Sequence, residues 1–145
     1  MMAFENPDRE QIKDILLNST TVAVVGLSDK PDRVSYMVSE AMQAKGYTII
    51  PVNPNADMIL GQKSYASLKD IPVPVDIVNV FRRSEHTPPV AEEAASIGAK
   101  TFWLQLGISN EEAAQIASAA GLNVVMDRCI KVEDSILLPG GKAKT

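Results

Sequence analysis

The sequence predicts an α/β domain in which a parallel β-sheet lies between two layers of helices. Short, nearly uncharged runs that are rich in β-branched residues are typical of strands buried on both faces of a parallel sheet. Such runs occur at 20–26, 47–52, 75–81, 100–104 and 122–126. Segments with a helical spacing of apolar residues separate most of these runs, and this alternation predicts right-handed βαβ units.

The helices are predicted from apolar spacing and from residues that are typical of helix ends. They are expected around Ile12, Ile15 and Leu16, and at 34–45, 87–97 and 110–120. We interpret Asn6 as the N-cap of the first helix, followed by Pro7, and Thr87 as the N-cap of the third. Residues 53–74 are expected to be irregular, with a short helical turn at 66–70.

Five such strands predict a small, three-layer αβα domain with a Rossmann-like fold. Counting strands along the chain, we expect the order 3-2-1-4-5. The domain is expected to span 1–138, with 139–145 as a flexible C-terminal tail. Ligands of these folds bind outside the carboxyl ends of the strands, where the strand order reverses. The residues that directly follow each strand are therefore the candidates for function.

Composition and charge exclude several classes of function. The chain has 145 residues, with 14 Lys+Arg, 18 Asp+Glu and a net charge of −4, which argues against a broad basic surface for nucleic acid. One cysteine rules out an internal disulfide framework. No apolar run nears the roughly 18 residues of a transmembrane helix, and the polar N-terminus does not resemble a signal peptide. We expect a reduced, cytoplasmic location, with neither a membrane nor a nucleic acid as partner.

The loop after the first predicted strand contains the parts of a phosphate site. Gly26 allows the backbone to turn sharply and to approach a ligand closely. The N-terminus of the following helix offers free N–H groups and a partial positive charge. Ser28 and Ser35 can donate hydroxyl hydrogen bonds. Lys30 and Arg33 can neutralise anionic oxygens.

Two familiar nucleotide motifs are missing from this loop. The dinucleotide fingerprint needs three glycines in the pattern G-x-G-x-x-G, and only Gly26 is present. The second strand ends in Asn53, where an acidic residue would hold the ribose of NAD. A P-loop sequence is absent as well. The alternative interpretation is that Gly26 and Ser28 only form a tight turn.

Six segments, taken in order, carry a family resemblance. They are 22–28 (VAVVGLS) with 33–36 (RVSY), 46–47 (GY) with 51–54 (PVNP), 59–61 (ILG) with 65–68 (YASL), 75–82 (VDIVNVFR), 103–108 (WLQLGI) and 126–130 (MDRCI). The chain resembles the small single-domain coenzyme A-binding proteins of bacteria and archaea over about residues 10–135. The same fold is similar to the CoA-binding domains of the succinyl-CoA synthetase α subunit and of ADP-forming acyl-CoA synthetases.

The resemblance implies that coenzyme A, or an acyl-CoA, lies across the carboxyl ends of the strands. The phosphates would be held by Gly26, Leu27, Ser28, Lys30, Arg33 and Ser35. Asn53 and Pro54 would flank the adenosine, and Phe81 and Arg82 would line the path of the ligand. The synthetases also carry a phosphohistidine domain and a grasp domain, for which this chain has no room, so synthetase activity is not expected.

Other residues leave alternatives open. Arg82 either contacts a phosphate or adenine, or belongs with Arg83 to a solvated basic pair. Cys129 is either a small buried hydrophobe or a thiol that forms a mixed disulfide with CoA. His86 has no partners at metal-ligand spacing, and Asp127 has no paired base. We therefore assign neither catalytic nor metal-binding residues.

Three hypotheses for function follow from these observations. The first is binding of CoA or an acyl-CoA without chemistry of its own, as a carrier, a sensor or a subunit for a partner. The second is a minimal NAD(P)-binding oxidoreductase. The third is an interaction protein with a vestigial nucleotide crevice. A protein partner or a homo-oligomer is compatible with each of them.

Overall fold

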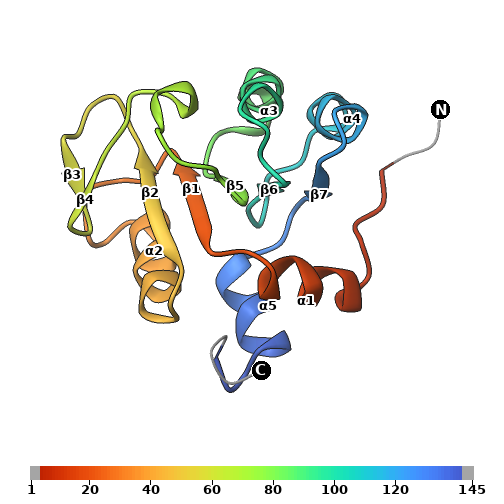
Figure 1. The fold of residues 1–145 in the computed structure, drawn as a ribbon, viewed down its shortest axis with the longest axis horizontal. Coiled ribbons are helices and arrows are strands. Elements are labelled where there is room, and N and C mark those ends of the chain that lie inside the picture. Colours follow the sequence, from red (N-terminus) through yellow and green to blue (C-terminus); the bar gives the residue numbers. More distant parts are fainter. Residues whose placement is uncertain (1–3, 142–145) are drawn as a thin grey trace.

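A single parallel sheet organises the protein in a computed structural model, which describes residues 4–141. Its five strands are β1 (Thr21–Val25), β2 (Thr48–Val52), β5 (Ile77–Val80), β6 (Thr101–Leu104) and β7 (Asn123–Val125). Helices α3 (Thr87–Ser96) and α4 (Glu111–Ala119) cover one face of the sheet (Figure 1). Helices α1 (Arg9–Leu17), α2 (Val34–Ala44) and α5 (Ile130–Leu137) cover the other. The predicted three-layer α/β class is thereby confirmed.

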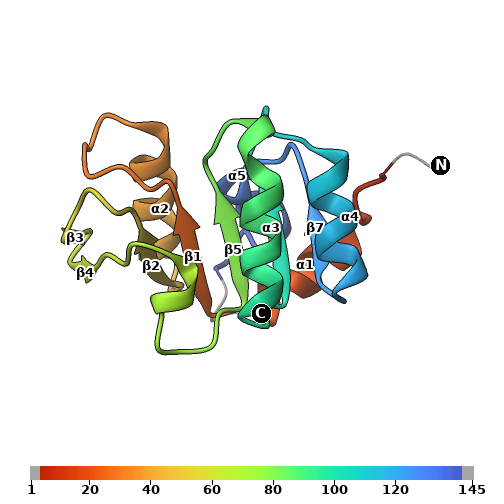
Figure 2. The ribbon, with the colours of Figure 1, turned by 90° about the horizontal axis from the view of Figure 1, so that it is seen from above.

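The predicted strand order 3-2-1-4-5 is wrong. The observed order is β2-β1-β5-β6-β7, which counts as 2-1-3-4-5 along the chain, so the third strand pairs with the first (Figure 2). Pro51 gives the physical reason: it has no N–H, and its carbonyl accepts from the Tyr65 N–H on the outer side of β2. Pro51 cannot donate a backbone hydrogen bond to a strand on the outer side of β2. Within residues 4–141 no further full strand pairs there, so β2 lies at the edge of the sheet.

The corrected order moves the point at which the strand order reverses. It now lies between β1 and β5, so the loops after these two strands face each other at the carboxyl edge. The chain between β2 and β5 contains no α-helix; it forms a small hairpin of β3 (Met58–Ile59) and β4 (Gln62–Lys63), then the 3-10 helix η1 (Leu68–Asp70). A second 3-10 helix, η2 (Ser84–His86), directly precedes α3.

The sheet separates two hydrophobic cores. Phe102 packs in the core under α3 and α4, whereas its neighbour Trp103 packs in the core on the side of α1, α2 and α5. Both are fully buried, as expected for side chains that fill the interior. The indole N–H of Trp103 donates to the carbonyl of Arg128 at 2.9 Å, so its one polar atom is satisfied.

Helix α1 begins later than predicted, and helix α3 begins one residue earlier. Asp8, and not Asn6, is the N-cap of α1: it accepts from the Gln11 N–H, and the Gln11 side chain accepts from the Asp8 N–H. Asn6 instead exchanges two hydrogen bonds with the backbone of Met126 and so covers the edge beside β7. Thr87 is the first residue of α3, after His86 as N-cap, and its hydroxyl donates to the Ser84 carbonyl.

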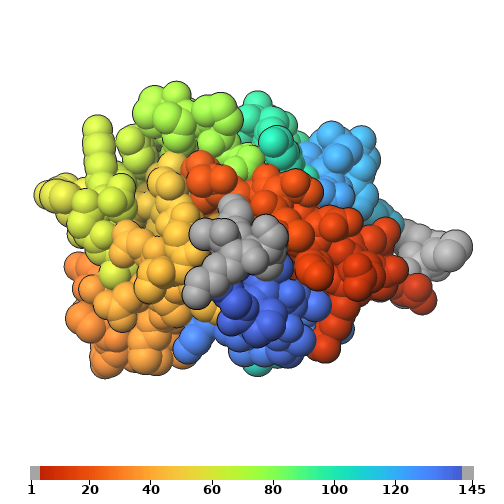
Figure 3. Space-filling model, turned by 60° about the horizontal axis from the view of Figure 1, so that its bottom comes forward, coloured from red at the N-terminus to blue at the C-terminus, as the bar shows by residue number. Residues whose placement is uncertain are grey.

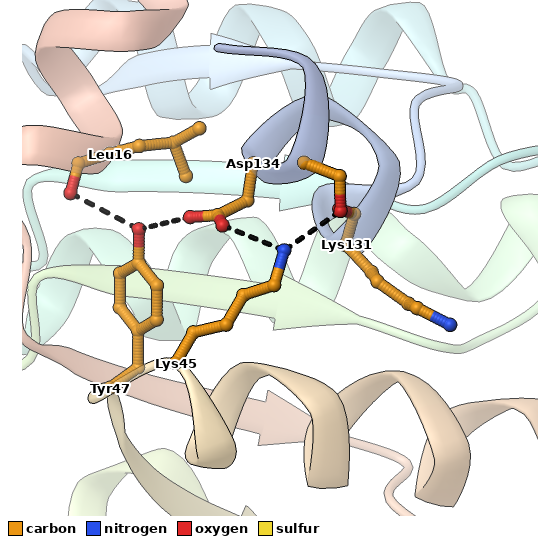
Figure 4. Close-up of polar contacts among 6 residues, drawn as sticks. Leu16, Lys45, Tyr47, Lys131 and Asp134 are labelled. Carbon is orange, nitrogen blue, oxygen red and sulfur yellow. Dashed lines mark hydrogen bonds and ion pairs between the residues drawn. The ribbon is translucent and has the colours of Figure 1, made fainter. Parts of the chain in front are cut away.

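Helix α5 was not predicted, because its inward face carries two acidic residues that interrupt the apolar spacing. Asp134 is buried and accepts from the Tyr47 hydroxyl at 2.6 Å and from Lys45 Nζ at 2.9 Å (Figure 4). Burial, and then the hydrogen bond and charge of Asp134, raise the pKa of Tyr47. Figure 3 shows α5 between α1 and α2, and the contacts of Asp134 link it to Lys45 at the end of α2 and to Tyr47. The predicted tail at 139–145 lies largely outside the described residues.

Candidate functional site

Two adjoining cavities lie at the carboxyl edge, between the loops that follow β1, β2 and β5; together we call them the crevice. The first measures about 540 Å³ and is lined by Gly26, Ser28, Lys30, Asp32, Arg33, Val34, Ser35 and Phe81. The second measures about 280 Å³ and is lined by Gly26, Ser28, Asn53, Pro54, Asn55, Phe81 and Arg82. The structure thus brings together every residue of the predicted site except Leu27.

Leu27 contributes only its backbone to this region. Its side chain is fully buried and packs in the core beside α2. Its carbonyl oxygen accepts a hydrogen bond from Asn53 Nδ2 at 2.9 Å. Because the side chain points into the core, a ligand in the crevice cannot contact it.

Gly26 is required by the close approach of β1 and β5. Its φ of +87° lies in the left-handed region, which side chains rarely tolerate. A Cβ at this position would also lie 2.3 Å from the carbonyl oxygen of Phe81. The Gly26 N–H donates to the Val52 carbonyl at 3.0 Å, so the turn is tied to β2 as well. Glycine here lets three strand ends converge on one point.

The N-terminus of α2 opens into the first cavity. Its N-cap, Arg33, makes no capping hydrogen bond with its side chain, and Val34 and Ser35 line the cavity. The first N–H groups of such a helix attract anions. Ser35 Oγ accepts from the Ser28 N–H at 3.0 Å, and Ser28 Oγ accepts from the Lys30 N–H at 3.1 Å. Each hydroxyl therefore still has its proton to donate to a ligand oxygen.

The side chain of Asn53, which lines the second cavity, also joins two loops of the site. Its Nδ2 donates to the Leu27 carbonyl at 2.9 Å, and its Oδ1 accepts from the Asn55 N–H at 2.8 Å. These bonds join the loop after β1 to the loop after β2. Pro54 and Asn55, both exposed, are left to form the wall of the second cavity.

The two arginines after β5 differ in position. Arg82 lies over the turn that Gly26 forms after β1, with its Nε 3.6 Å from the position that a Cβ of Gly26 would occupy. It lines the second cavity, whereas Arg83 lines neither part of the crevice. Arg82 also borders a smaller space of about 170 Å³ beside α3, together with His86 and Glu93. The cationic groups that reach the crevice are thus Lys30, Arg33 and Arg82.

The remaining candidates, Asp127 and Cys129, lie outside the lining of the crevice. Asp127, with a φ of +57°, accepts from the Gly107 N–H at 2.6 Å and so holds the turn after β6. Cys129 is the half-buried N-cap residue of α5. Within residues 4–141, no group of His, Cys, Asp and Glu is arranged to hold a metal ion. No helix in that range is long and apolar enough to cross a membrane.

A third cavity, of about 610 Å³ and so larger than either part of the crevice, lies at the opposite edge, between the segment before α1 and the starts of β6 and β7. Acidic residues and amides line it, with Lys100 as the one cation in its lining. The crevice has three cations and a helix N-terminus without a side-chain cap, whereas this cavity has one cation and lies beside the N-terminus of α1, which the capping box of Asp8 and Gln11 closes. Asp32, Val34 and Asn55 belong to the crevice but were not predicted, although each follows or precedes a predicted site residue.

The chain is similar to several known proteins. The family described as CoA binding domain matches residues 20–135. The uncharacterized protein YneT of Bacillus subtilis (strain 168) is 56% identical over 132 residues, which are 91% of this chain and 98% of that protein. A solved structure of a hypothetical protein from Pyrococcus horikoshii OT3 has a TM-score of 0.89 at 35% identity, covering 95% of this chain and 99% of that one.

A larger enzyme shares part of the sequence. Acetate–CoA ligase (ADP-forming) II of Archaeoglobus fulgidus is 37% identical over 82 residues. The aligned part is 55% of this chain but only 12% of the ligase. The chain therefore corresponds to a small portion of that enzyme.

Proposed function

This chain belongs to the CoA binding domain family, and from that premise we propose that it binds coenzyme A or an acyl-CoA in the crevice. The single observation that carries the proposal is that the open N-terminus of α2 and Gly26 line the same cavity. The absence of a Cβ at Gly26 keeps this cavity open beside the Phe81 backbone. A cradle of free N–H groups with two nearby cations suits the pyrophosphate of such a ligand.

The parts of the ligand are assigned by the chemistry of the crevice. The pyrophosphate would lie at the N-terminus of α2, between Lys30 and Arg33, with the hydroxyl protons of Ser28 and Ser35 as further donors. The adenosine would lie against Pro54 and Asn55 in the second cavity. Arg82, above Gly26, would contact a phosphate or stack on the adenine.

We propose a binding role without chemistry, as a carrier, a sensor or a subunit for a protein partner. The crevice contains cations, hydroxyls and amides, and its one carboxylate, Asp32, has no neighbouring base in the lining. Such a set binds and orients a polyphosphate but supplies no general acid–base pair. An NAD(P)-dependent reaction is disfavoured, because β2 is followed by Asn53, an amide that joins Leu27 to Asn55, and not by the acidic residue that holds the ribose of NAD.

The test is thermal and chemical unfolding of the purified chain with CoA, acetyl-CoA, NAD or NADP. A ligand at about 100 times its dissociation constant should raise the free energy of unfolding by about 2.7 kcal/mol. We expect stabilisation by CoA and acetyl-CoA. Stabilisation by NAD alone would favour the oxidoreductase, and no shift with any ligand would favour an interaction protein.

A further inference from the structure

Two amide side chains form a buried pair beside the crevice. Asn79, in β5, is 1% exposed, and Gln105, directly after β6, is 3% exposed. Gln105 Nε2 donates to Asn79 Oδ1 at 2.8 Å. Apart from this pair, the two strand ends are apolar, and buried polar groups in such surroundings are destabilising unless they find partners.

The pair leaves one N–H₂ group and one carbonyl oxygen without a partner. Among residues 4–141, the contacts of these side chains do not involve Asn79 Nδ2 or Gln105 Oε1. In that range, the side-chain N and O atoms that have no partner and are closed to solvent are Ser39 Oγ and Glu133 Oε1. Asn79 Nδ2 and Gln105 Oε1 are not among them, so solvent reaches both of these atoms. Turning both amides by 180° exchanges their roles and again leaves one N–H₂ and one carbonyl free.

The pair lies beside Phe81, which lines both cavities of the crevice, although neither amide residue belongs to those linings. Asn79 precedes Phe81 by two residues, and side chains at this spacing in a strand share a face. Val78 and Val80 pack in the core under α3 and α4, so Asn79 faces the α2 side with Phe81. Gln105 lies next to Phe81 on the adjacent strand, because its N–H bonds to the Val80 carbonyl. A ligand that passes Phe81 from the N-terminus of α2 therefore reaches the pair next.

We propose that Asn79 and Gln105 bind a secondary amide of the ligand. A –CO–NH– group presents one acceptor and one donor, which complement the free N–H₂ and carbonyl of the pair. This inference rests on the proposed function, since the pantetheine arm of coenzyme A carries two such amides. The pair thus selects for the arm, whereas Lys30 and Arg33 serve the phosphates.

The test compares two ligands by calorimetric titration: coenzyme A, and adenosine 3′-phosphate 5′-diphosphate, which lacks the arm. Gln105→Met removes both hydrogen-bonding groups and keeps a similar length. Its Kd for coenzyme A should rise about tenfold, as expected for the loss of one or two hydrogen bonds, with less than about a twofold change for the truncated ligand. Gln105→Glu, which leaves only acceptors facing the ligand, should have the same selective effect.

Thr101→Val is the matched control, because Thr101 is a buried polar residue at the other end of β6. It should change neither affinity. Equal weakening of both ligands by Gln105→Met and Gln105→Glu would mean that the pair only positions the loops, and unchanged affinities would also overturn the inference. If the wild-type chain binds neither ligand, the proposed function itself fails, which is a distinct result.

Discussion

Gly26 and Phe81 approach so closely that a single added carbon on residue 26 would lie 2.3 Å from the Phe81 carbonyl oxygen. The two residues end neighbouring strands, β1 and β5, at the point where the strand order reverses. This contact brings the loop that leads to α2 beside the loop that contains Arg82. The crevice therefore depends on a backbone contact as much as on the side chains that line it.

Gly26→Ala should destabilise the protein and weaken CoA binding, because the Phe81 backbone must move. Gly121→Ala is the control: Gly121 has a similar φ of +90°, but nothing lies within 4 Å of its Cβ position. Urea unfolding should show that Gly26→Ala loses about 1–3 kcal/mol more than the control, the range for overpacked sites. Equal losses would mean that the left-handed φ, and not the contact with Phe81, requires glycine.

Arg33→Ala should weaken CoA binding more than Arg83→Ala. Arg33 lines the first cavity at the N-terminus of α2, whereas Arg83 lines neither part of the crevice. Loss of a charge-assisted contact to phosphate should raise the Kd about tenfold, measured by calorimetry at low salt. If both variants bind with equal affinity, Arg33 has no specific role.

Tyr47→Phe should lower the stability without altering the crevice. The variant removes the hydroxyl that donates to the buried Asp134, a hydrogen bond to a charged group of about 1.5–3 kcal/mol. Urea unfolding measures this loss, and CoA affinity should stay unchanged because Tyr47 lies under α5 and away from the crevice lining. Tyr36→Phe is the control for removing a tyrosine hydroxyl, and a loss of equal size there would remove the special role of Asp134.

Asp76 should make the stability depend on acid pH. Partial burial works against the ionised carboxylate, but N–H groups of Thr21 and Thr20, and then Lys100, outweigh it and lower the pKa below 3.8. Because the pKa is lower in the folded state, the stabilisation is complete above the unfolded pKa. It is lost as the pH falls through the folded one.

Asp76→Asn should therefore reduce stability at pH 7, and the difference from the wild type should shrink as the pH falls below about 3.8. Urea unfolding at pH 7 and at pH 3 measures this difference. Asp57→Asn, at an exposed position, is the control and should show little change at either pH. A constant difference across this range would contradict the role of the Asp76 charge.

Particular residues explain which features could be predicted. Every strand of the parallel sheet was found where a β-branched run predicted it, whereas the hairpin of β3 and β4 lies in the segment that was expected to be irregular. Gly26, Ser28, Lys30, Arg33 and Ser35 meet in one cavity, because residues after parallel strands share one edge. Pro51 also carried the signal for an edge strand, which would have excluded the order 3-2-1-4-5. Helix α5 was missed because Glu133 and Asp134 interrupt the apolar spacing on its buried face.

The sequence by itself determined the α/β class, the positions of the strands and the family, because local spacing and short motifs carry that information. Only the tertiary structure decided which strands are neighbours and which side chains are free to meet a ligand. Both depend on contacts between residues far apart in the chain. Thus the hydrogen bond of Asn53 to the Leu27 carbonyl joins loops 26 residues apart, and the pairing of Asn79 with Gln105 exists only because β5 lies beside β6.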